Sequence, residues 1–179
     1  MRVVAGKYRH RIIEITNLET TRETQDRVRE AIFNSIGPKI YGKSVLDLFA
    51  GSGSMGIEAI SRGASWAHFN DINNKALNTV KKNLDTLGID EYSITKLDYL
   101  EFLKNTNKFF DYIFVDPPYK DVDLKVMLEA ICNSKASKNG TIISFEMSSA
   151  IKPLELENVA LLKEKKYGSK KVLFFEVKK

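Results

Sequence analysis

Cysteine and histidine are scarce in this sequence. The single cysteine, Cys132, cannot form an internal disulfide, and the only histidines are His10 and His68. Structural zinc sites need four ligands, mostly thiolates and imidazoles, so this supply argues against a dedicated zinc site. We therefore expect no bound metal and a protein that works in a reducing, cytoplasmic setting.

Long apolar runs are also missing. No uncharged stretch approaches the roughly 20 apolar residues that a membrane-spanning helix needs. Four basic residues, Arg2, Lys7, Arg9 and Arg11, interrupt any apolar core of a signal peptide near the first residue. We expect no membrane association. The 179 residues are 43% apolar and 28% charged, which is typical of a globule with one well-buried core. We expect residues 1–179 to form one domain, and the protein to be a monomer.

The formal net charge is +5, and the positive charge is unevenly distributed. Residues 1–11 hold four arginines and lysines and no acid, and the segment "TRETQDRVREA" adds Arg22, Arg27 and Arg29. Phosphate contacts carry most of the non-specific affinity for nucleic acids, so such clusters suit a polyanionic partner. The alternative is a solvated basic end without a partner.

Hydrophobic periodicity predicts an α/β fold. Two β-rich runs on either side of residues 6–10 predict a small hairpin within an N-terminal extension, 1–20. A helix is expected from Thr24, as its cap, to residue 36. Strands are then expected at 44–49, 66–71, 92–97, 110–116 and 140–146, and helices at 54–63, 74–88, 99–103 and 123–134. This alternation predicts a doubly wound, mostly parallel sheet, and residues 160–177 predict a C-terminal antiparallel hairpin.

A glycine-rich loop lies between the first predicted strand and helix of this series. In "VLDLFAGSGSMGIEA", Gly51, Gly53 and Gly56 have the GxGxxG spacing that lets a backbone turn sharply and approach a ligand. Asp71 ends the next strand 20 residues after Gly51, where an acid binds ribose hydroxyls in nucleotide sites. A purely structural role for the glycines or for Asp71 is the alternative.

Two further acids bear on the identity of this ligand. Asp47 lies inside the first strand, where its carboxylate would repel a pyrophosphate but could pair with a cationic amine. S-adenosylmethionine has such an amine and no phosphate. Asp98 could accept a hydrogen bond from the adenine amino group, or could equally be the N-cap of the short helix that follows it.

The sequence "FDYIFVDPPYKD" ends a predicted strand on an acid. The two prolines fix φ and stiffen the turn, so the Pro117 carbonyl and the Asp116 carboxylate can be aimed at one point. Two acceptors suit an exocyclic NH2 group, which has two hydrogens to donate. Tyr119 offers a face for a base, worth roughly 1–3 kcal/mol. The alternative is a rigid turn.

These motifs match a known family. "DPPY" with "DLFAGSGSMGIEA" resembles the amino-directed class of S-adenosylmethionine-dependent methyltransferases. "RVVAGKYRHRIIE", "TRETQDRVREAIFNSI" and "KKYGSKKVLFFE" are similar to the bacterial RsmD family, which methylates guanine N2 in small-subunit ribosomal RNA. The resemblance covers essentially the whole chain. It implies a Rossmann-like class I fold with a seven-stranded sheet, S-adenosylmethionine as cofactor, and ribosomal RNA or the assembling small subunit as partner.

The residues and the resemblance together give a candidate site. The catalytic candidates are Asp116, Pro117 and Tyr119. The cofactor-binding candidates are Asp47, Phe49, Gly51, Ser52, Gly53, Gly56, Asp71, Ile72, Asp98 and Tyr99, together with Thr24 and Arg27, whose segment folds over the cofactor in the family. The substrate-binding candidates are Pro118, Tyr8, Arg9, Arg11 and Arg22. Tyr8 could stack on a base or simply pack, and Arg29 could cover the cofactor or pair with Glu30 or Asp26 at the surface.

The chain departs from the family pattern at a few positions. His10 replaces an expected glycine, Glu23 an expected proline and Gln25 a small hydroxyl residue, while Asp71 replaces the more usual Glu. Three other functions remain open from the sequence: an adenine-N6 methyltransferase of nucleic acid, a non-catalytic RNA-binding assembly factor that keeps the pocket, and a nicotinamide oxidoreductase.

Overall fold

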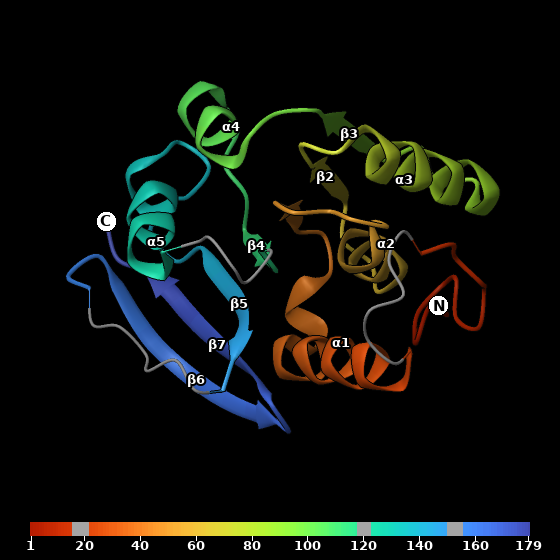
Figure 1. The fold of residues 1–179 in the computed structure, drawn as a ribbon, viewed down its shortest axis with the longest axis horizontal. Helices are drawn as coiled ribbons and strands as arrows, with labels where there is room; N and C mark the ends of the chain where they lie inside the picture. Colours follow the sequence, from red (N-terminus) through yellow and green to blue (C-terminus); the bar gives the residue numbers. More distant parts are fainter. Residues whose placement is uncertain (16–21, 118–122, 150–155) are drawn as a thin grey trace.

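The computed structural model describes residues 1–15, 22–117, 123–149 and 156–179, with the backbone alone for 22–25. Within these residues the strands form one seven-stranded sheet of order β3-β2-β1-β4-β5-β7-β6 (Figure 1). The strands are β1 Ser44–Asp47, β2 Trp66–Asn70, β3 Tyr92–Thr95, β4 Tyr112–Val115, β5 Ile142–Ser148, β6 Val159–Tyr167 and β7 Lys170–Val177. The first five are parallel, and β7 pairs antiparallel with both β5 and β6. The predicted sheet and C-terminal hairpin are confirmed.

Helices cover both faces of the sheet. They are α1 Arg22–Ile36, α2 Ser54–Ser61, α3 Asn74–Leu87, α4 Tyr99–Asn105 and α5 Leu124–Asn133, and a 3-10 turn, η1 Gly37–Ile40, follows α1. Strand β4 is buried on both faces of the sheet, and its successive side chains point alternately to one face and the other. Tyr112 and Phe114 pack in the cluster that includes α1, α2 and α3. Ile113 and Val115 pack in the cluster that includes α4 and α5. The sheet is therefore doubly wound.

Short polar residues and glycines set most helix ends where the sequence predicts them. Asn73 caps α3 by accepting from the Lys75 N–H at 2.8 Å, and Gly88 ends that helix in the left-handed region with φ 65°. The predicted start of α1 was wrong. The helix begins at Arg22, so Thr24 lies inside the first turn and is not its N-cap.

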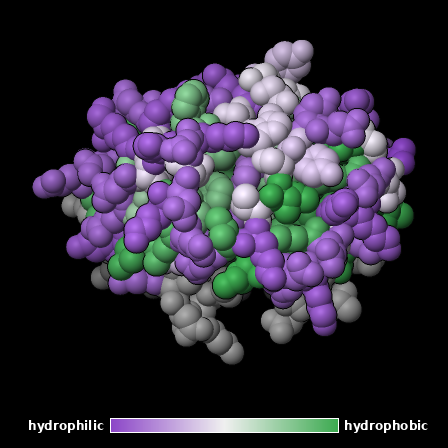
Figure 2. All heavy atoms as spheres, turned by 90° about the horizontal axis from the view of Figure 1, so that it is seen from above, coloured by the Kyte–Doolittle hydropathy of each residue, from purple (hydrophilic) through white to green (hydrophobic). Residues whose placement is uncertain are grey.

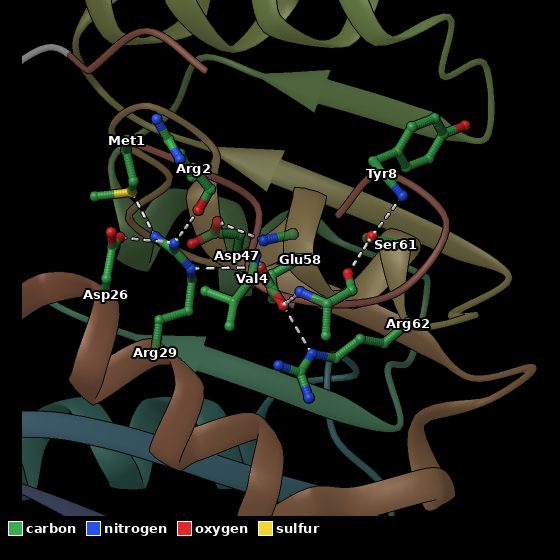
Figure 3. Close-up of polar contacts among 12 residues, drawn as sticks. Met1, Arg2, Val4, Tyr8, Asp26, Arg29, Asp47, Glu58, Ser61 and Arg62 are labelled. Carbon is green, nitrogen blue, oxygen red and sulfur yellow. Dashed lines mark hydrogen bonds and ion pairs between the residues drawn. The ribbon is translucent and has the colours of Figure 1, made fainter. Parts of the chain in front are cut away.

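The N-terminal segment is less regular than predicted. We call residues 1–15 the basic arm; the rest of the predicted extension, 16–20, lies outside the described residues. The two halves of the basic arm pair antiparallel through one isolated bridge, between Arg2 and Ile12, and the arm forms no strand. The loop between them lies against α2, where a Cβ on Gly6 would come within 1.8 Å of the Ser61 carbonyl oxygen. The arm is held both by backbone hydrogen bonds of its own, such as that from the Val3 N–H to the Arg11 carbonyl at 3.0 Å, and by the helices beneath it, as Figure 3 shows for its first residues.

Hydrophilic side chains dominate the face shown in Figure 2, and hydrophobic atoms are exposed between them. In the described part of the chain, no helix is long and apolar enough to cross a membrane. Over the same residues, no group of three or more His, Cys, Asp or Glu could hold a metal ion.

His68 is buried, and its two ring nitrogens hydrogen-bond to the hydroxyls of Ser93 and Thr95. Burial, and then the Lys108 charge, lower its pKa to about 4, so the ring is neutral at physiological pH.

We predict that the backbone at His10 favours glycine. His10 has φ 69° and is the one residue other than glycine with positive φ in the described ranges. The left-handed conformation costs an ordinary side chain about 1–2 kcal/mol, and the side chain is exposed, so packing changes little. His10→Gly should melt at or above the wild-type temperature. His10→Val should be less stable than His10→Gly by about 1–2 kcal/mol. Equal stability of the two variants in thermal unfolding would contradict this conformational argument.

Candidate cofactor and substrate site

The candidate site lies at the carboxyl ends of β2, β1 and β4. In open parallel sheets, ligands bind at this edge where the strand order reverses. The reversal here is between β1 and β4, which are neighbours, with Asp47 level with Phe114. The acid two residues beyond Phe114, Asp116, therefore follows the strand next to the one that leads into the glycine loop.

The glycine loop is held by the acid that follows β2. Gly51 and Gly53 have φ 54° and 79°, values that favour glycine. The Gly51 N–H donates to Asp71 Oδ2 at 2.9 Å, and the other carboxylate oxygen accepts from the Asn73 N–H at 2.8 Å. A carboxylate has about four lone-pair sites, so Asp71 keeps acceptor capacity for ligand hydroxyls. Its role in loop structure is observed, and its role in ribose binding remains a prediction.

The third glycine has a packing role. A Cβ on Gly56, in the first turn of α2, would lie 2.3 Å from the Phe69 ring, whereas a Cβ on Gly51 would meet nothing within 4 Å. The absence of a side chain at Gly56 thus lets α2 approach β2. The purely structural role that the sequence left open for the glycines is therefore observed at Gly56. A ligand has room beside the loop at Gly51 instead.

Asp47 is a buried carboxyl group among other acids. Its Oδ2 accepts a hydrogen bond from the Gly56 N–H at 3.1 Å. The pKa of Asp47 is raised to about 8: burial is the largest cause, the hydrogen bond from Gly56 opposes it, and the negative charges of Asp116 and Asp71 add to the rise. Acids from the ends of β1, β2 and β4 therefore act on one another electrostatically, and a cation placed between them would relieve their repulsion.

Asn70 holds this edge of the sheet together, and the sequence analysis missed it. Its buried amide donates to the carbonyls of Leu48 at 3.2 Å and Leu97 at 3.1 Å, and it accepts from the Thr95 hydroxyl at 2.8 Å. These partners follow or lie on β1 and β3, so one side chain joins the ends of three strands. The available signal was a polar residue at the end of the apolar strand "WAHFN".

The structure brings several of the predicted cofactor residues together. The Phe49 and Tyr99 rings are tilted against each other with centroids 5.5 Å apart. Burial, with the charges of Asp98 and Asp123, raises the pKa of Tyr99. Asp98 is the N-cap of α4, accepting from the Leu100 N–H at 2.9 Å, so the structural role considered for it is observed. Ile72 is 66% exposed and free to cover a ligand.

Only part of the predicted catalytic turn lies among the described residues. Asp116 is exposed at the edge of the sheet and Pro117 is buried directly after it. Pro118 and Tyr119 lie outside the described residues, as do the side chains of Arg22 and Thr24. A hollow of about 310 Å³ on α5 contains none of the predicted site residues; its lining is Lys125, Glu129, Cys132, Asn133 and residues 156–158.

The candidate residues of the basic arm and of α1, predicted to bind RNA or to cover the cofactor, divide into exposed and buried ones. Arg9, Arg11 and Arg27 are exposed. Tyr8 is only 8% exposed and belongs to the core, so its ring packs and cannot stack on a base. Arg29 is also buried. It pairs with Asp26 at 2.8 Å, as one alternative expected, but only the Asp26 side chain, 35% exposed, reaches the surface.

Glu58 is a second polar residue that the sequence analysis missed. This buried acid on α2 accepts from the N–H groups of Val4 at 2.8 Å and Ala5 at 3.0 Å, and from Arg62 Nε at 2.8 Å, while Arg29 Nε is 3.5 Å away (Figure 3). An acid in the apolar helix "SMGIEAI" was its only signal. The Glu58 carboxylate fixes the start of the basic arm to α2.

Comparison with known proteins agrees with this geometry. A family model described as "Conserved hypothetical protein 95" matches residues 1–176. The chain is 36% identical over 172 residues to Ribosomal RNA small subunit methyltransferase D of Haemophilus influenzae, covering 94% of this chain and 89% of that protein. A solved structure described as "Putative methyltransferase yhhF from Escherichia coli" superimposes with a TM-score of 0.89 at 29% identity, covering 99% of this chain and 98% of that one. A solved structure described as "Crystal structure of SMU.776, a putative methyltransferase complexed with SAH" has a TM-score of 0.69 at 15% identity, covering 88% of this chain and 50% of that one, which is a likeness of fold.

We predict that Asp47 destabilises the free protein at neutral pH. Its pKa is about 8 in the folded chain against 3.8 for an ordinary Asp, so the folded state binds the proton more tightly. Protonation of Asp47 therefore stabilises the folded state. This stabilisation is complete below about pH 4 and is lost as the pH rises towards 8. Asp47→Asn keeps an acceptor for the Gly56 N–H and cannot ionise. Its melting temperature relative to wild type should rise steadily from pH 5 to pH 8.

Differential scanning fluorimetry at several pH values measures this difference. The matched control is Asp90→Asn, which removes an exposed carboxylate and should give a difference that changes little with pH. A pH-independent difference for Asp47→Asn would show that the carboxyl is not strongly perturbed.

Proposed function

Since this chain belongs to the family described as "Conserved hypothetical protein 95", with a 36% identical relative named as a ribosomal RNA methyltransferase, we propose that it methylates small-subunit ribosomal RNA. Its cofactor is S-adenosylmethionine and its target is the exocyclic N2 amine of a guanine. The observation that carries the proposal is the adjacency of β1 and β4. It places Asp116 close enough to the glycine loop for its charge to raise the pKa of Asp47.

The residues at the site fit this cofactor. S-adenosylmethionine supplies an activated methyl group on a sulfonium and carries a cationic amine. A cationic ligand favours the ionised form of Asp47, which with the neighbouring acids then gives the negative surroundings that both cationic centres require and that a pyrophosphate would not tolerate. Asp71 keeps acceptor sites for ribose hydroxyls. Phe49, Ile72 and Tyr99 offer apolar surfaces for the adenine, and Asp98 can accept from its amino group.

Asp116 and Pro117 prepare the amine for methyl transfer. Guanine N2 is a weak nucleophile because its lone pair is delocalised into the ring. Hydrogen bonds from both amino protons to the Asp116 carboxylate and the Pro117 carbonyl favour a pyramidal nitrogen with a free lone pair. A nitrogen–carbon bond would then form as the carbon–sulfur bond breaks, leaving S-adenosylhomocysteine, and the ammonium-like nitrogen would lose one proton to water. Pro118 and Tyr119 hold the unstacked base.

The basic segments bind the RNA backbone. Arg9 and Arg11 project from the basic arm and Arg22 lies at the start of α1, while Thr24 and Arg27 belong to the segment that covers the cofactor. Residues 1–179 act as one methyltransferase domain, as a monomer in the cytoplasm, on ribosomal RNA or on the assembling small subunit.

Replacement of Asp116 tests the mechanism. Asp116→Ala should bind S-adenosylhomocysteine within a few-fold of wild type, because Asp116 acts on the substrate amine. It should lose turnover by about 100-fold or more, the cost of a misplaced reacting group. Calorimetry measures the binding, and methyl transfer to 16S ribosomal RNA from cells that lack the protein measures the turnover. The control is Asp85→Ala, an exposed acid on α3; near-normal turnover of Asp116→Ala would remove Asp116 from the mechanism.

The same reaction identifies the product. Mass spectrometry of nucleosides from the methylated RNA should show N2-methylguanosine. N6-methyladenosine would establish the adenine alternative. No methylated nucleoside, with cofactor binding intact, would establish a non-catalytic RNA-binding role.

Removal of charge from the basic arm tests the RNA surface. Arg9→Ala with Arg11→Ala should weaken RNA binding and lower the slope of log K against log salt by about 0.7–0.9 for each phosphate that the arm no longer neutralises. Filter binding between 50 and 200 mM salt measures the slope. Lys104→Ala with Lys135→Ala removes the same charge from α4 and the region after α5. If only this control pair lowered the slope, the RNA would bind on another face.

A further inference from the structure

Asn83 is a buried amide on α3 that contacts two parts of the site at once. Its Oδ1 accepts from the Glu14 N–H at 2.8 Å, and its Nδ2 donates to the Glu14 carbonyl at 3.0 Å. The same Nδ2 donates to the Ser52 carbonyl at 3.0 Å. Glu14 belongs to the basic arm and Ser52 to the glycine loop. One side chain that is 3% exposed therefore joins the arm to the loop.

The position of Asn83 makes this contact unusual for a core residue. It lies beside Val80 and Leu84 on the buried stripe of α3, where an apolar side chain would be ordinary. A Cβ on Gly53 would be 3.2 Å from Val80, so this part of α3 packs directly against the loop. A buried amide that loses its partners costs about 1–3 kcal/mol. The backbone of the arm and that of the loop thus stabilise the same group.

The arm is also fixed to the helix that begins at this loop. Ser61 on α2 accepts from the Tyr8 N–H through Oγ at 3.0 Å (Figure 3). Its carbonyl accepts from the Lys7 N–H at 2.7 Å. Glu58 accepts from two further N–H groups of the arm. Through Glu58, Ser61 and Asn83, the arm is bonded to the two helices that pack around the glycine loop.

We infer that Asn83 is a positioning residue that couples the glycine loop to the basic arm, so that cofactor binding orders the arm and favours RNA binding. A ligand that restrains the loop fixes the Ser52 carbonyl. This keeps Asn83 in the orientation that bonds Glu14. The arm then opens less often, so it loses less conformational entropy when it binds RNA. By linkage, RNA on the arm strengthens cofactor binding by the same factor. The RNA half of this inference rests on the proposed function.

Hydrogen exchange tests the coupling without RNA. The probes are the arm amides of Val3, His10 and Ile13, which donate within the arm. Saturating S-adenosylhomocysteine should slow their exchange about fivefold or more, within the range of typical coupling energies. Asn83→Ala should abolish this slowing. The matched control is Asn78→Ala, the same change at an exposed position of the same helix, which should keep it.

A second variant separates coupling from folding. Asn83→Asp keeps an acceptor for the Glu14 N–H but, when ionised, cannot donate to the carbonyls of Ser52 and Glu14. It should fold, bind S-adenosylhomocysteine, and show no slowing of the arm amides. If S-adenosylhomocysteine fails to slow these amides in the wild type, or slows them equally in a folded Asn83 variant, the inference is overturned.

RNA binding supplies the second readout. The affinity for a 16S ribosomal RNA transcript should rise about fivefold or more with S-adenosylhomocysteine in wild type and in Asn78→Ala, and should not change in the Asn83 variants. In a variant that circular dichroism shows to be folded under the assay conditions, a loss of stability alone does not change this ratio. A ratio in the variants equal to that of wild type, with methylation by wild type intact, would overturn the coupling and leave the proposed function standing. Absence of methylation by wild type would refute the function, while the exchange experiment still decides the coupling.

Discussion

The parallel register of β1 against β4 is the constraint on which the site depends. Asp47 is level with Phe114, so the turn that begins at Asp116 starts beside the loop that contains Gly51. No single hydrogen bond fixes this register. It is specified by two buried strands whose side chains pack alternately on opposite faces of the sheet, because a shift by one residue would move every one of them to the wrong face.

This arrangement has an electrostatic cost in the free protein. A parallel sheet collects the carboxyl ends of its strands at one edge, and here three strands each supply an acid: Asp47, Asp71 and Asp116. Two of these acids raise the pKa of the third, which burial has already raised. The repulsion within this cluster opposes folding, and the same repulsion favours the binding of a cationic ligand. Asp47 therefore lowers the stability of the free protein and raises its affinity for such a ligand.

The sequence predicted the parts of this structure that depend on local patterns. Alternating apolar runs indicated the strands and their parallel arrangement. The spacing of Gly51 and Asp71 marked both as parts of one site, but their hydrogen bond of 2.9 Å was not predicted. Asn70, Glu58 and Asn83 were missed because their partners are backbone groups 22–69 residues away, and nothing local marks a carbonyl or N–H that lacks a ladder partner. The structural role considered for Gly56 could not be given a partner for the same reason, since that requires the position of Phe69 on β2.

The three missed residues have one physical role in common. In an open α/β sheet, the backbone is satisfied inside strands and helices, but the loops at the carboxyl edge and the irregular arm have few ladder bonds. Buried side chains supply the missing partners: Asn70 for the strand ends, Glu58 for the start of the arm, and Asn83 for the arm and the loop. The elements themselves would still pack without these groups. Their polar bonds therefore determine mainly where the loops and the arm lie, and so the geometry of the site more than the existence of the fold.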